Sequence, residues 1–372
     1  MAIAYLQFPP QYSAAFNPII MVVQTPKARY VQLEKDLAAT SDPDERAKIQ
    51  DEMNDLEKDK DQDWLDPIPV VLIIGNNADN RSVTIEREPD AEGKAEIDLS
   101  YLARYAFINK KRRVYTTIVD YNLGGRISIE NTDRTEQVWS GYLLNAVQQL
   151  GYYDDQGLQE VRFSTTRKKA IKYPGYDLQI ATLYPKSGSP GYALMNGGGG
   201  SVYSLPTFVS VINIGEDRYD RVVIHARASL DSEILATLPI EAGCVPSVPF
   251  YVRWINSLGG WDYQMFECNE QIMEVTDFEN IQKVPTDIHD TQQTLDATVT
   301  ETVTAGLGGL TREDYDTLVA LPRSPHIEWY DEMRSSWQTI LLSEDFSAVW
   351  NSRNAFGQVE FTFLKPRILT QF

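Results

Sequence analysis

Cysteine and histidine are scarce in this sequence. Of its 372 residues, only two are cysteines, Cys244 and Cys268, and three are histidines. Disulfide scaffolds and zinc sites need several such residues at short spacings, so neither is expected to organise the fold. Two isolated cysteines are typical of buried free thiols in a protein that assembles in a reducing cytoplasm. The sequence predicts no metal site and no cofactor.

Long apolar runs are also missing. The best of them, Ile68–Ile74, has the length of a strand, whereas about 18–20 residues are needed to cross a bilayer. The first residues lack the basic segment and the unbroken apolar segment of a secretory signal. We therefore expect no membrane insertion and no export by a signal peptide.

Positive charge is in the minority, with 34 Lys and Arg against 53 Asp and Glu and a net charge of −19. A field of this sign repels phosphate backbones, so direct binding of nucleic acid is not expected. Two basic clusters depart from the average, Lys110–Arg113 and the group Arg167, Lys168, Lys169 and Lys172. Each is interpreted as a solvated face or a salt-bridge patch between subunits, with phosphate binding as the alternative.

Motifs of catalysis are absent as well. His225 lies in an alternating strand pattern, which is typical of a core or sheet-face histidine. The Asp-x-Asp-x-Asp spacing that begins at Asp59 lacks the glycine and the glutamate of a calcium loop. Asp262 and Glu328 each adjoin a tryptophan, as in glycoside hydrolases, but among 53 acidic residues such neighbours are expected by chance. The sequence therefore predicts a protein that is not an enzyme.

Threonine and glycine gather in one stretch near the C-terminus. The Thr-rich residues Thr294–Thr304 are followed by Gly306–Gly309. No strand clearly leads into the glycines and no Lys-Ser/Thr pair follows them, so a phosphate-binding loop is disfavoured. We interpret the glycines as a flexible linker that follows the Thr-rich stretch.

Aromatic and β-branched residues are abundant, with 20 tyrosines and 7 tryptophans. Short alternating runs, such as Val359–Phe363, recur along the chain and predict strands. One stretch differs: residues 28–66 are rich in Glu, Asp, Lys, Leu and Ala, with helical apolar spacing on both sides of Pro43. The predicted fold is mainly β, with β-sandwich-like domains, a few helices and an inserted N-terminal helical hairpin.

Three domains are predicted. The first covers residues 1–110 and carries the hairpin; a central β-rich domain covers 111–245; a C-terminal β-rich domain covers 246–372. In the central domain, residues 136–150 place several apolar side chains at helical spacing before Gly151, which predicts a helix. In the last domain, Thr311 begins a helix in the manner of a capping box.

A turn rich in residues that tolerate positive φ, Asn256–Gly260, separates two aromatic runs and predicts a β-hairpin. Aromatic hairpins of this kind build sandwich cores or subunit interfaces, because aromatic rings bury a large area at low entropic cost. The aromatic residues that we predict as interface candidates are Trp254, Trp261, Tyr263, Phe266, Trp329, Tyr330, Trp337 and Trp350. The alternative is that Trp329, Tyr330, Trp337 and Trp350 stack on sugar rings.

Several phrases resemble structural proteins in the tail and baseplate modules of Bacteroidetes-type bacteriophages and prophages. The phrases are Phe16-Asn17-Pro18-Ile19-Ile20, residues Leu144–Gly151, residues Val252–Phe266, and a close in which Leu310-Thr311 opens a helix before Ser324-Pro325 and a final alternating strand. They are spread over most of the chain.

This resemblance implies a virion structural protein that forms an oligomeric ring or sleeve of a phage tail, tail tip or baseplate. Its partners would then be copies of itself and other virion proteins, and it would be assembled in the host cytoplasm before it joins the virion. The alternative is a carbohydrate- or receptor-binding module of a phage or cell surface, which would use its aromatic residues to bind a surface glycan.

Overall fold

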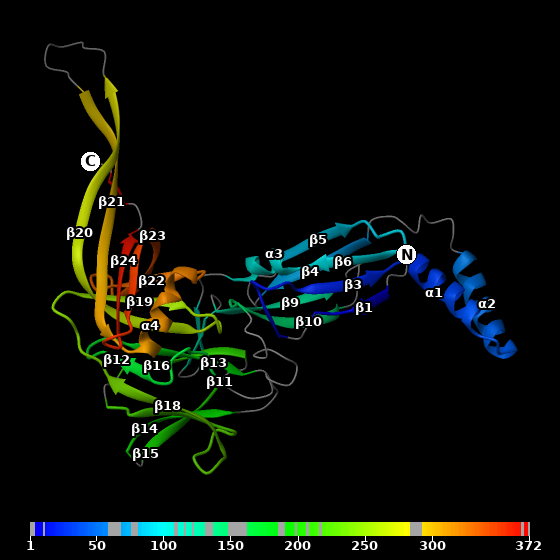
Figure 1. The fold of residues 1–372 in the computed structure, drawn as a ribbon, viewed down its shortest axis with the longest axis horizontal. Coiled ribbons are helices and arrows are strands. Elements are labelled where there is room, and N and C mark those ends of the chain that lie inside the picture. The colour runs from blue at the N-terminus through cyan, green and yellow to red at the C-terminus, as the bar shows by residue number, and fades with distance from the viewer. Residues whose placement is uncertain are drawn as a thin grey trace.

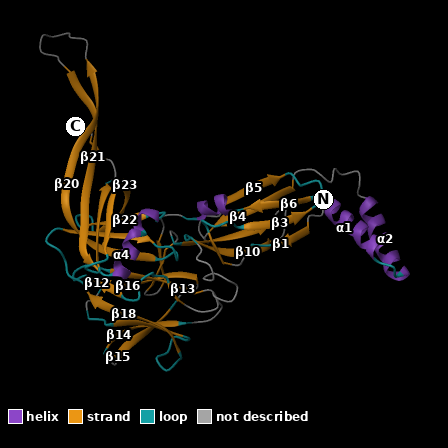
Figure 2. Cartoon of the chain, in the orientation of Figure 1, coloured by secondary structure: helices purple, strands orange, loops and turns teal. Residues whose placement is uncertain are grey.

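The chain is mainly β, as predicted, and helices form one end of the molecule (Figures 1 and 2). The computed structural model describes residues 4–9, 12–58, 68–75, 81–107, 111–114, 117–120, 123–130, 137–147, 162–184, 190–197, 199–205, 208–215, 218–282, 292–365 and 368–370. Asp59 and the acidic spacing that it begins lie outside these ranges.

Two sheets form the region nearest the N-terminus. The first contains β1 (Ala4–Gln7), β3 (Ile20–Gln24) and β6 (Lys94–Asp98). The second contains, in spatial order, β2 (Tyr12–Ala14), β10 (Gln137–Leu144), β9 (Gly124–Glu130), β4 (Ile68–Gly75) and β5 (Arg81–Arg87). Buried aliphatic side chains from both sheets, including Met21, Ile97 and Ile129, share one core.

Helices α1 (Pro26–Ala39) and α2 (Pro43–Lys58) lie at the end of the molecule far from the C-terminal strands (Figure 1). They contact each other, and the Arg29 side chain binds the Glu52 carboxylate at 2.8 Å. Most of their other residues are exposed. Two short helices follow β6, α3 (Ser100–Ala103) and η1 (Arg104–Ala106). Within the described ranges, no helix combines the length and the apolar character that crossing a bilayer requires.

The helix predicted over residues 136–150 is wrong, because residues 137–144 form strand β10. This strand is paired on both sides, antiparallel to β9 and parallel to β2. Trp139 and Tyr142 favour strands, and Gly141 disfavours a helix interior. Two ladders of backbone hydrogen bonds therefore outweigh an apolar spacing that suits a helix.

Two further sheets of five strands form the central region. One runs β11 (Arg162–Phe163), β13 (Leu178–Tyr184), β16 (Phe208–Ile214), β8 (Thr117–Asp120) and β7 (Lys111–Val114). The other runs β12 (Ala170–Lys172), β18 (Ile234–Ala242), β17 (Arg221–His225), β14 (Gly191–Asn196) and β15 (Gly199–Ser204). Both contribute to one core cluster. Strand β9 lies after residue 110 but pairs with β4 of the N-terminal region, whereas β7 and β8 belong to the central region. Strand pairing therefore crosses the boundary predicted at residue 110.

The C-terminal strands close into a barrel of six strands. Around it run β19 (Pro249–Ile255), β22 (Ile327–Asp331), β23 (Ser336–Asn351), β24 (Phe356–Leu364), β21 (Gln292–Leu310) and β20 (Trp261–Gln282), and β20 also pairs with β21. Strand β25 (Ile368–Thr370) adds to β21. Phe266, Phe361 and Phe363 are buried inside. Helix α4 (Arg312–Val319) packs on β24 and is followed by η3 (Leu321–Arg323).

The predicted hairpin between β19 and β20 is confirmed. Its turn is held by Asn256, whose Oδ1 accepts hydrogen bonds from the backbone N–H groups of Leu258 and Gly260 at 2.9 and 3.1 Å. Gly259 has a backbone φ of +78°, which residues with a Cβ atom rarely adopt. The helix predicted at Thr311 is also confirmed, with the Thr311 side chain accepting from the backbone of Asp314.

Candidate functional site

Strands β20 and β21 continue beyond the barrel as a two-stranded ribbon. β19 pairs with β20 only up to Glu267, and β24 pairs with β21 only up to Thr302, whereas β20 and β21 stay paired to their far ends. We call residues 268–282 and 292–301 the arm. At ~3.3 Å per residue, its β20 strand is about 45 Å long. Figure 1 shows the arm standing clear of the barrel.

The linker predicted at Gly306–Gly309, after the Thr-rich stretch Thr294–Thr304, is wrong, because these glycines belong to β21, as the threonines do. Threonine is β-branched and fits the pleated surface of a strand, which explains the long pairing. Gly306 suits a close approach of two strands, since a Cβ there would lie 2.9 Å from the carbonyl oxygen of Val359. The pairing of β20 with β21 shifts register at three places, and such bulges increase the local twist of a ribbon.

The arm has edges with few partners. In the described part of the chain, no strand pairs with the outer edge of β20 beyond Glu267. On the outer edge of β21 in the arm, the only described strand that pairs is β25, opposite residues 297–299, and the Lys365 N–H donates to the carbonyl oxygen of Glu301. An unpaired strand edge presents backbone donors and acceptors to a strand of another chain. The arm is therefore suited to extending a sheet between molecules.

The charge of the arm has one sign. Its residues include six acidic ones and neither lysine nor arginine; the acidic residues are Glu270, Glu274, Asp277, Glu279, Asp296 and Glu301. Glu270 and Glu274 are exposed. Glu301 is half-buried where the arm meets the barrel, and there it binds Lys365. The sequence of the arm beyond this pair is acidic, with Glu274 exposed, and negative charge favours a cationic partner.

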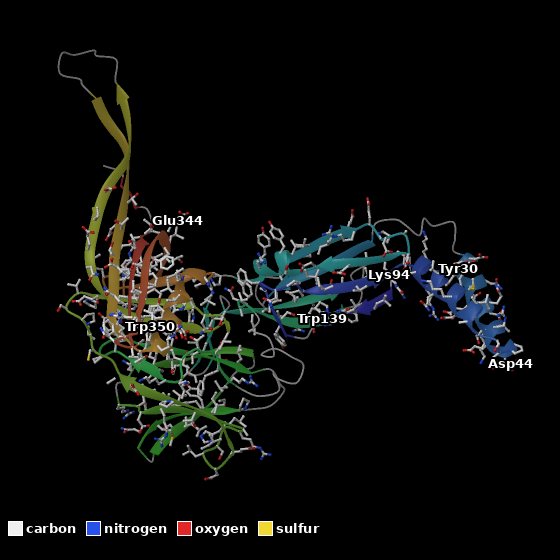
Figure 3. All side chains as sticks on the ribbon, viewed as in Figure 1. Tyr30, Asp44, Lys94, Trp139, Glu344 and Trp350 are labelled. Atoms are coloured by element: carbon white, nitrogen blue, oxygen red, sulfur yellow. The ribbon has the colours of Figure 1, made fainter. Side chains whose placement is uncertain are left out.

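Apolar side chains are exposed at the base of the arm and on the adjacent barrel wall. Ile272 is 41% exposed and Met273 is 64% exposed. Ile272 lies opposite Thr302, Thr302 opposite Leu364, and Leu364 opposite Leu341, which is 66% exposed. Directly opposed residues share one face of an antiparallel sheet, so this row presents apolar atoms on the outer side of the wall. Val349, in the same β23 strand as Leu341, is also exposed. Glu344 of this strand is labelled in Figure 3.

Four of the eight predicted interface residues are buried within their own chain. Trp254 and Phe266 lie in the barrel core, and Trp261 and Tyr263 lie in the core that the barrel shares with the central sheets. Their prediction as surfaces for another subunit is therefore wrong. Both faces of the aromatic hairpin are covered, one by the barrel and the other by the central region.

The other four predicted residues are half-buried. Tyr330 and Trp337 pack on the core that joins the barrel to the central sheets. Trp329 stacks on Phe250 and faces the Lys365 ammonium at 4.7 Å. Trp350, marked in Figure 3, packs against Tyr315 and lies 5.0 Å from the Arg312 guanidinium carbon. The structure does not bring the eight residues together on one surface.

Arg253 fixes the barrel to the central region. Its buried guanidinium lies between the rings of Trp261 and Trp337, at 4.2 and 4.3 Å from their centroids. It binds the Glu328 carboxylate, which is also buried, and donates to the side chain of Gln179 in β13. A cation held between two aromatic faces and a carboxylate is paired on every side, which makes this contact specific.

Several tyrosines line the same junction, and burial keeps them neutral. Burial raises the pKa of the Tyr251 phenol well above its usual value, and it raises that of Tyr173 as well. Burial and a hydrogen bond to Glu332 raise the pKa of Tyr176. A neutral phenol donates a hydrogen bond without the cost of burying a charge, so these groups serve packing.

The basic cluster at residues 167–172 is paired inside the chain. Lys168 lies 3.3 Å from Glu313, and Lys169 lies 2.7 Å from Glu241. The buried Lys172 ammonium donates to two backbone carbonyl oxygens, and the buried Arg167 binds Gln264. The four basic side chains therefore already have partners within the chain, and these partners would compete with a phosphate. The phosphate-binding alternative loses support. The other cluster contains β7, whose residues 111–114 lie at the edge of a sheet.

The carboxylates considered for catalysis are held by structural partners. Asp262 accepts hydrogen bonds from the hydroxyls of Thr165 and Thr166, and Glu328 binds Arg253 and His326. In the described ranges, no three His, Cys, Asp or Glu side chains are grouped to hold a metal ion. Both cysteines are free thiols, but Cys244 is exposed and Cys268 is half-buried, so the predicted burial is wrong.

Comparison with known proteins adds no assignment: no family model matches the chain, and the search of curated proteins gives no match. The geometry of the arm, the barrel wall and the sheet edges is therefore the basis of the functional argument.

Proposed function

We propose that this protein is a structural subunit of a bacteriophage virion, an oligomeric part of a tail, tail tip or baseplate that acts by protein–protein assembly. It is assembled in the host cytoplasm, and its partners are copies of itself and other virion proteins. The observation that carries the proposal is the arm. A long pair of strands outside any core adds little to the stability of its own chain.

The surroundings of the arm support the same proposal. Ile272 and Leu341 lie in one row of exposed apolar side chains that a neighbouring molecule would cover, and Met273 is exposed on the other face of β20. The barrel and the Arg253 junction provide a rigid base that holds the arm in one direction. Subunits of rings and sleeves need both features, a rigid body and a projection that reaches the next subunit.

We infer that the two central sheets, which share one core, form a β-sandwich-like body, and that α1 and α2 are a helical hairpin inserted into the first β-region. Most residues of α2 are exposed, as expected for an element that meets a neighbouring protein.

The glycan-binding alternative has less support. A ring that stacks on a sugar needs one open face. The Trp329 ring has Phe250 on it and Lys365 over it, and the Trp350 ring has Tyr315 and Arg312 beside it. No other described feature favours sugar binding over assembly.

Removal of the arm tests the proposal. A variant that replaces residues 275–299 by Asn-Gly joins Glu274 to Thr300, which lie opposite each other, through a two-residue turn. We expect the intact chain to form oligomers in light scattering and electron microscopy, and the shortened chain to remain monomeric. Its melting temperature should change by no more than about 3 °C, because the barrel core is unchanged.

A second measurement concerns the virion. Mass spectrometry of purified particles from the phage or prophage that encodes the chain should detect it at the copy number of a structural protein. A chain that is monomeric at every concentration and absent from the particles would contradict the proposal.

A further inference from the structure

We propose that the arm of one copy binds the outer edge of strand β7 in the next copy, so that molecules associate head to tail. This inference rests on the proposed function, because it names the partner of the arm. Three observations support it: β20 and β7 each have an edge that pairs with no described strand, their charges are opposite, and they lie on different parts of one molecule.

Pairing of two arms with each other is disfavoured. The arm carries six acidic residues and no basic ones, and two arms in contact would bring like charges together. Like charges on opposed strands destabilise a sheet. The arm therefore requires an edge with positive charge.

β7 is the edge strand that provides this charge. It is the last strand of its sheet, with β8 on one side and, in the described part of the chain, no strand on the other. Three of its four residues are basic, Lys111, Arg112 and Arg113, and Lys110 precedes them. Other edge strands fit less well: β15 is uncharged, and β5 and β6 contain acidic residues among their basic ones.

The two edges are also complementary in their backbone. In the described part of the chain, no strand pairs with the outer edge of β20 over residues 269–282, a stretch longer than β7, so strand addition can choose its register. Backbone hydrogen bonds then supply affinity, and the opposite charges select this edge over the others. An arm and an edge on different parts of one molecule make a heterologous contact, which generates rings when the rotation closes.

Charge reversal on each side tests the contact in the full chain. The arm variant is Glu270→Lys with Glu274→Lys, and the edge variant is Lys111→Glu with Arg113→Glu. A control for the arm variant, Glu88→Lys with Glu92→Lys, makes the same change of charge as that variant at two exposed residues outside both surfaces. Sedimentation velocity should show self-association of each test variant weakened by about 10–100-fold, and that of the control unchanged.

Mixing the two test variants should restore assembly. In the mixture, the new lysines in the arm of one variant meet the new glutamates in the edge of the other, and the unchanged acidic arm meets the unchanged basic edge, so both contacts are again attractive. Carbodiimide treatment of a mixture of ¹⁵N-labelled and unlabelled intact chain should also join Glu270 or Glu274 to Lys111 between copies, as read by mass spectrometry.

Two outcomes separate this inference from the proposed function. If the edge variant assembles like the control while the arm truncation abolishes assembly, the arm binds another surface: the inference is overturned and the proposed function stands. If the intact chain never self-associates and is absent from virions, the proposed function fails as well.

Discussion

Strands β20 and β21 each have one half in the barrel and one half in the arm, and the halves differ in what covers them. In the barrel half, Phe266, Val303 and Ala305 are inaccessible to solvent or nearly so. In the arm, Ile272 and Met273 expose much of their side chains. The backbone pairing is continuous from one half to the other.

The contrast separates two tasks within one pair of strands. Burial of a large apolar side chain stabilises a fold by roughly 1.5–3 kcal/mol, so the barrel half sets the register and the direction of the ribbon. A two-stranded ribbon in water is only marginally stable by itself. The arm half therefore contributes little to folding and leaves its edges and side chains available to a partner.

The largest effect is expected at the base that holds the barrel. Arg253→Met removes the guanidinium between two tryptophans and leaves the buried Glu328 carboxylate without its main cation. Loss of one partner of a buried ion pair costs about 3–5 kcal/mol. Denaturant unfolding followed by tryptophan fluorescence should show this loss.

The double variant Arg253→Met with Glu328→Leu is the control for that measurement. It replaces both charges by apolar side chains and should recover most of the lost stability. A loss below about 1 kcal/mol for the single variant would mean that the junction does not depend on this pair.

Gly260→Ala should have a smaller effect than Arg253→Met. A Cβ at Gly260 would lie 1.7 Å from the carbonyl oxygen of Ser164, so the backbones of the hairpin and of the central region must separate. Overpacking of this kind costs about 1–3 kcal/mol. Gly308→Ala in β21 is the matched substitution, because no atom lies within 4 Å of its Cβ position. Thermal melts that show equal shifts for the two variants would contradict the assignment of Gly260 to a tight junction.

A smaller effect is expected at the helix that follows β21. Thr311→Ala removes the hydroxyl that accepts a hydrogen bond from the Asp314 backbone N–H at 3.2 Å. Loss of such a cap costs about 1 kcal/mol, because the N–H loses its partner. Thr311→Ser keeps the hydroxyl and should restore stability in urea unfolding. If serine and alanine behave alike, the cap does not stabilise α4.

The local parts of this half of the molecule could be predicted from the sequence. The turn at Asn256–Gly260 and the cap at Thr311 depend on residues that are neighbours in the chain, and both were expected correctly. Their signals are the chemistry of φ > 0 and of helix termini, which do not depend on the rest of the fold.

Barrel closure and the arm could not be predicted in the same way. Both depend on the pairing of β20 with β21, and the glycines of β21 have the composition of a linker. β10 shows a related failure, since an apolar spacing that suits a helix is overruled by two neighbouring strands. The aromatic residues correctly indicated positions that need to be covered. The local sequence does not tell whether the surface that covers them belongs to the same chain or to another.

The most direct test of the contrast compares two methionines of one strand. Met265 is 2% exposed in the barrel half of β20, and Met273 is 64% exposed in the arm. Met265→Ser should cost about 2–5 kcal/mol, because it removes a buried apolar side chain and buries a hydroxyl. Met273→Ser should change the free energy of unfolding by no more than about 0.5 kcal/mol. Guanidinium unfolding of the monomeric chain at low concentration measures both values. A Met273 effect as large as that of Met265 would mean that the arm is folded against its own chain, and the division between a stabilising half and a binding half would be wrong.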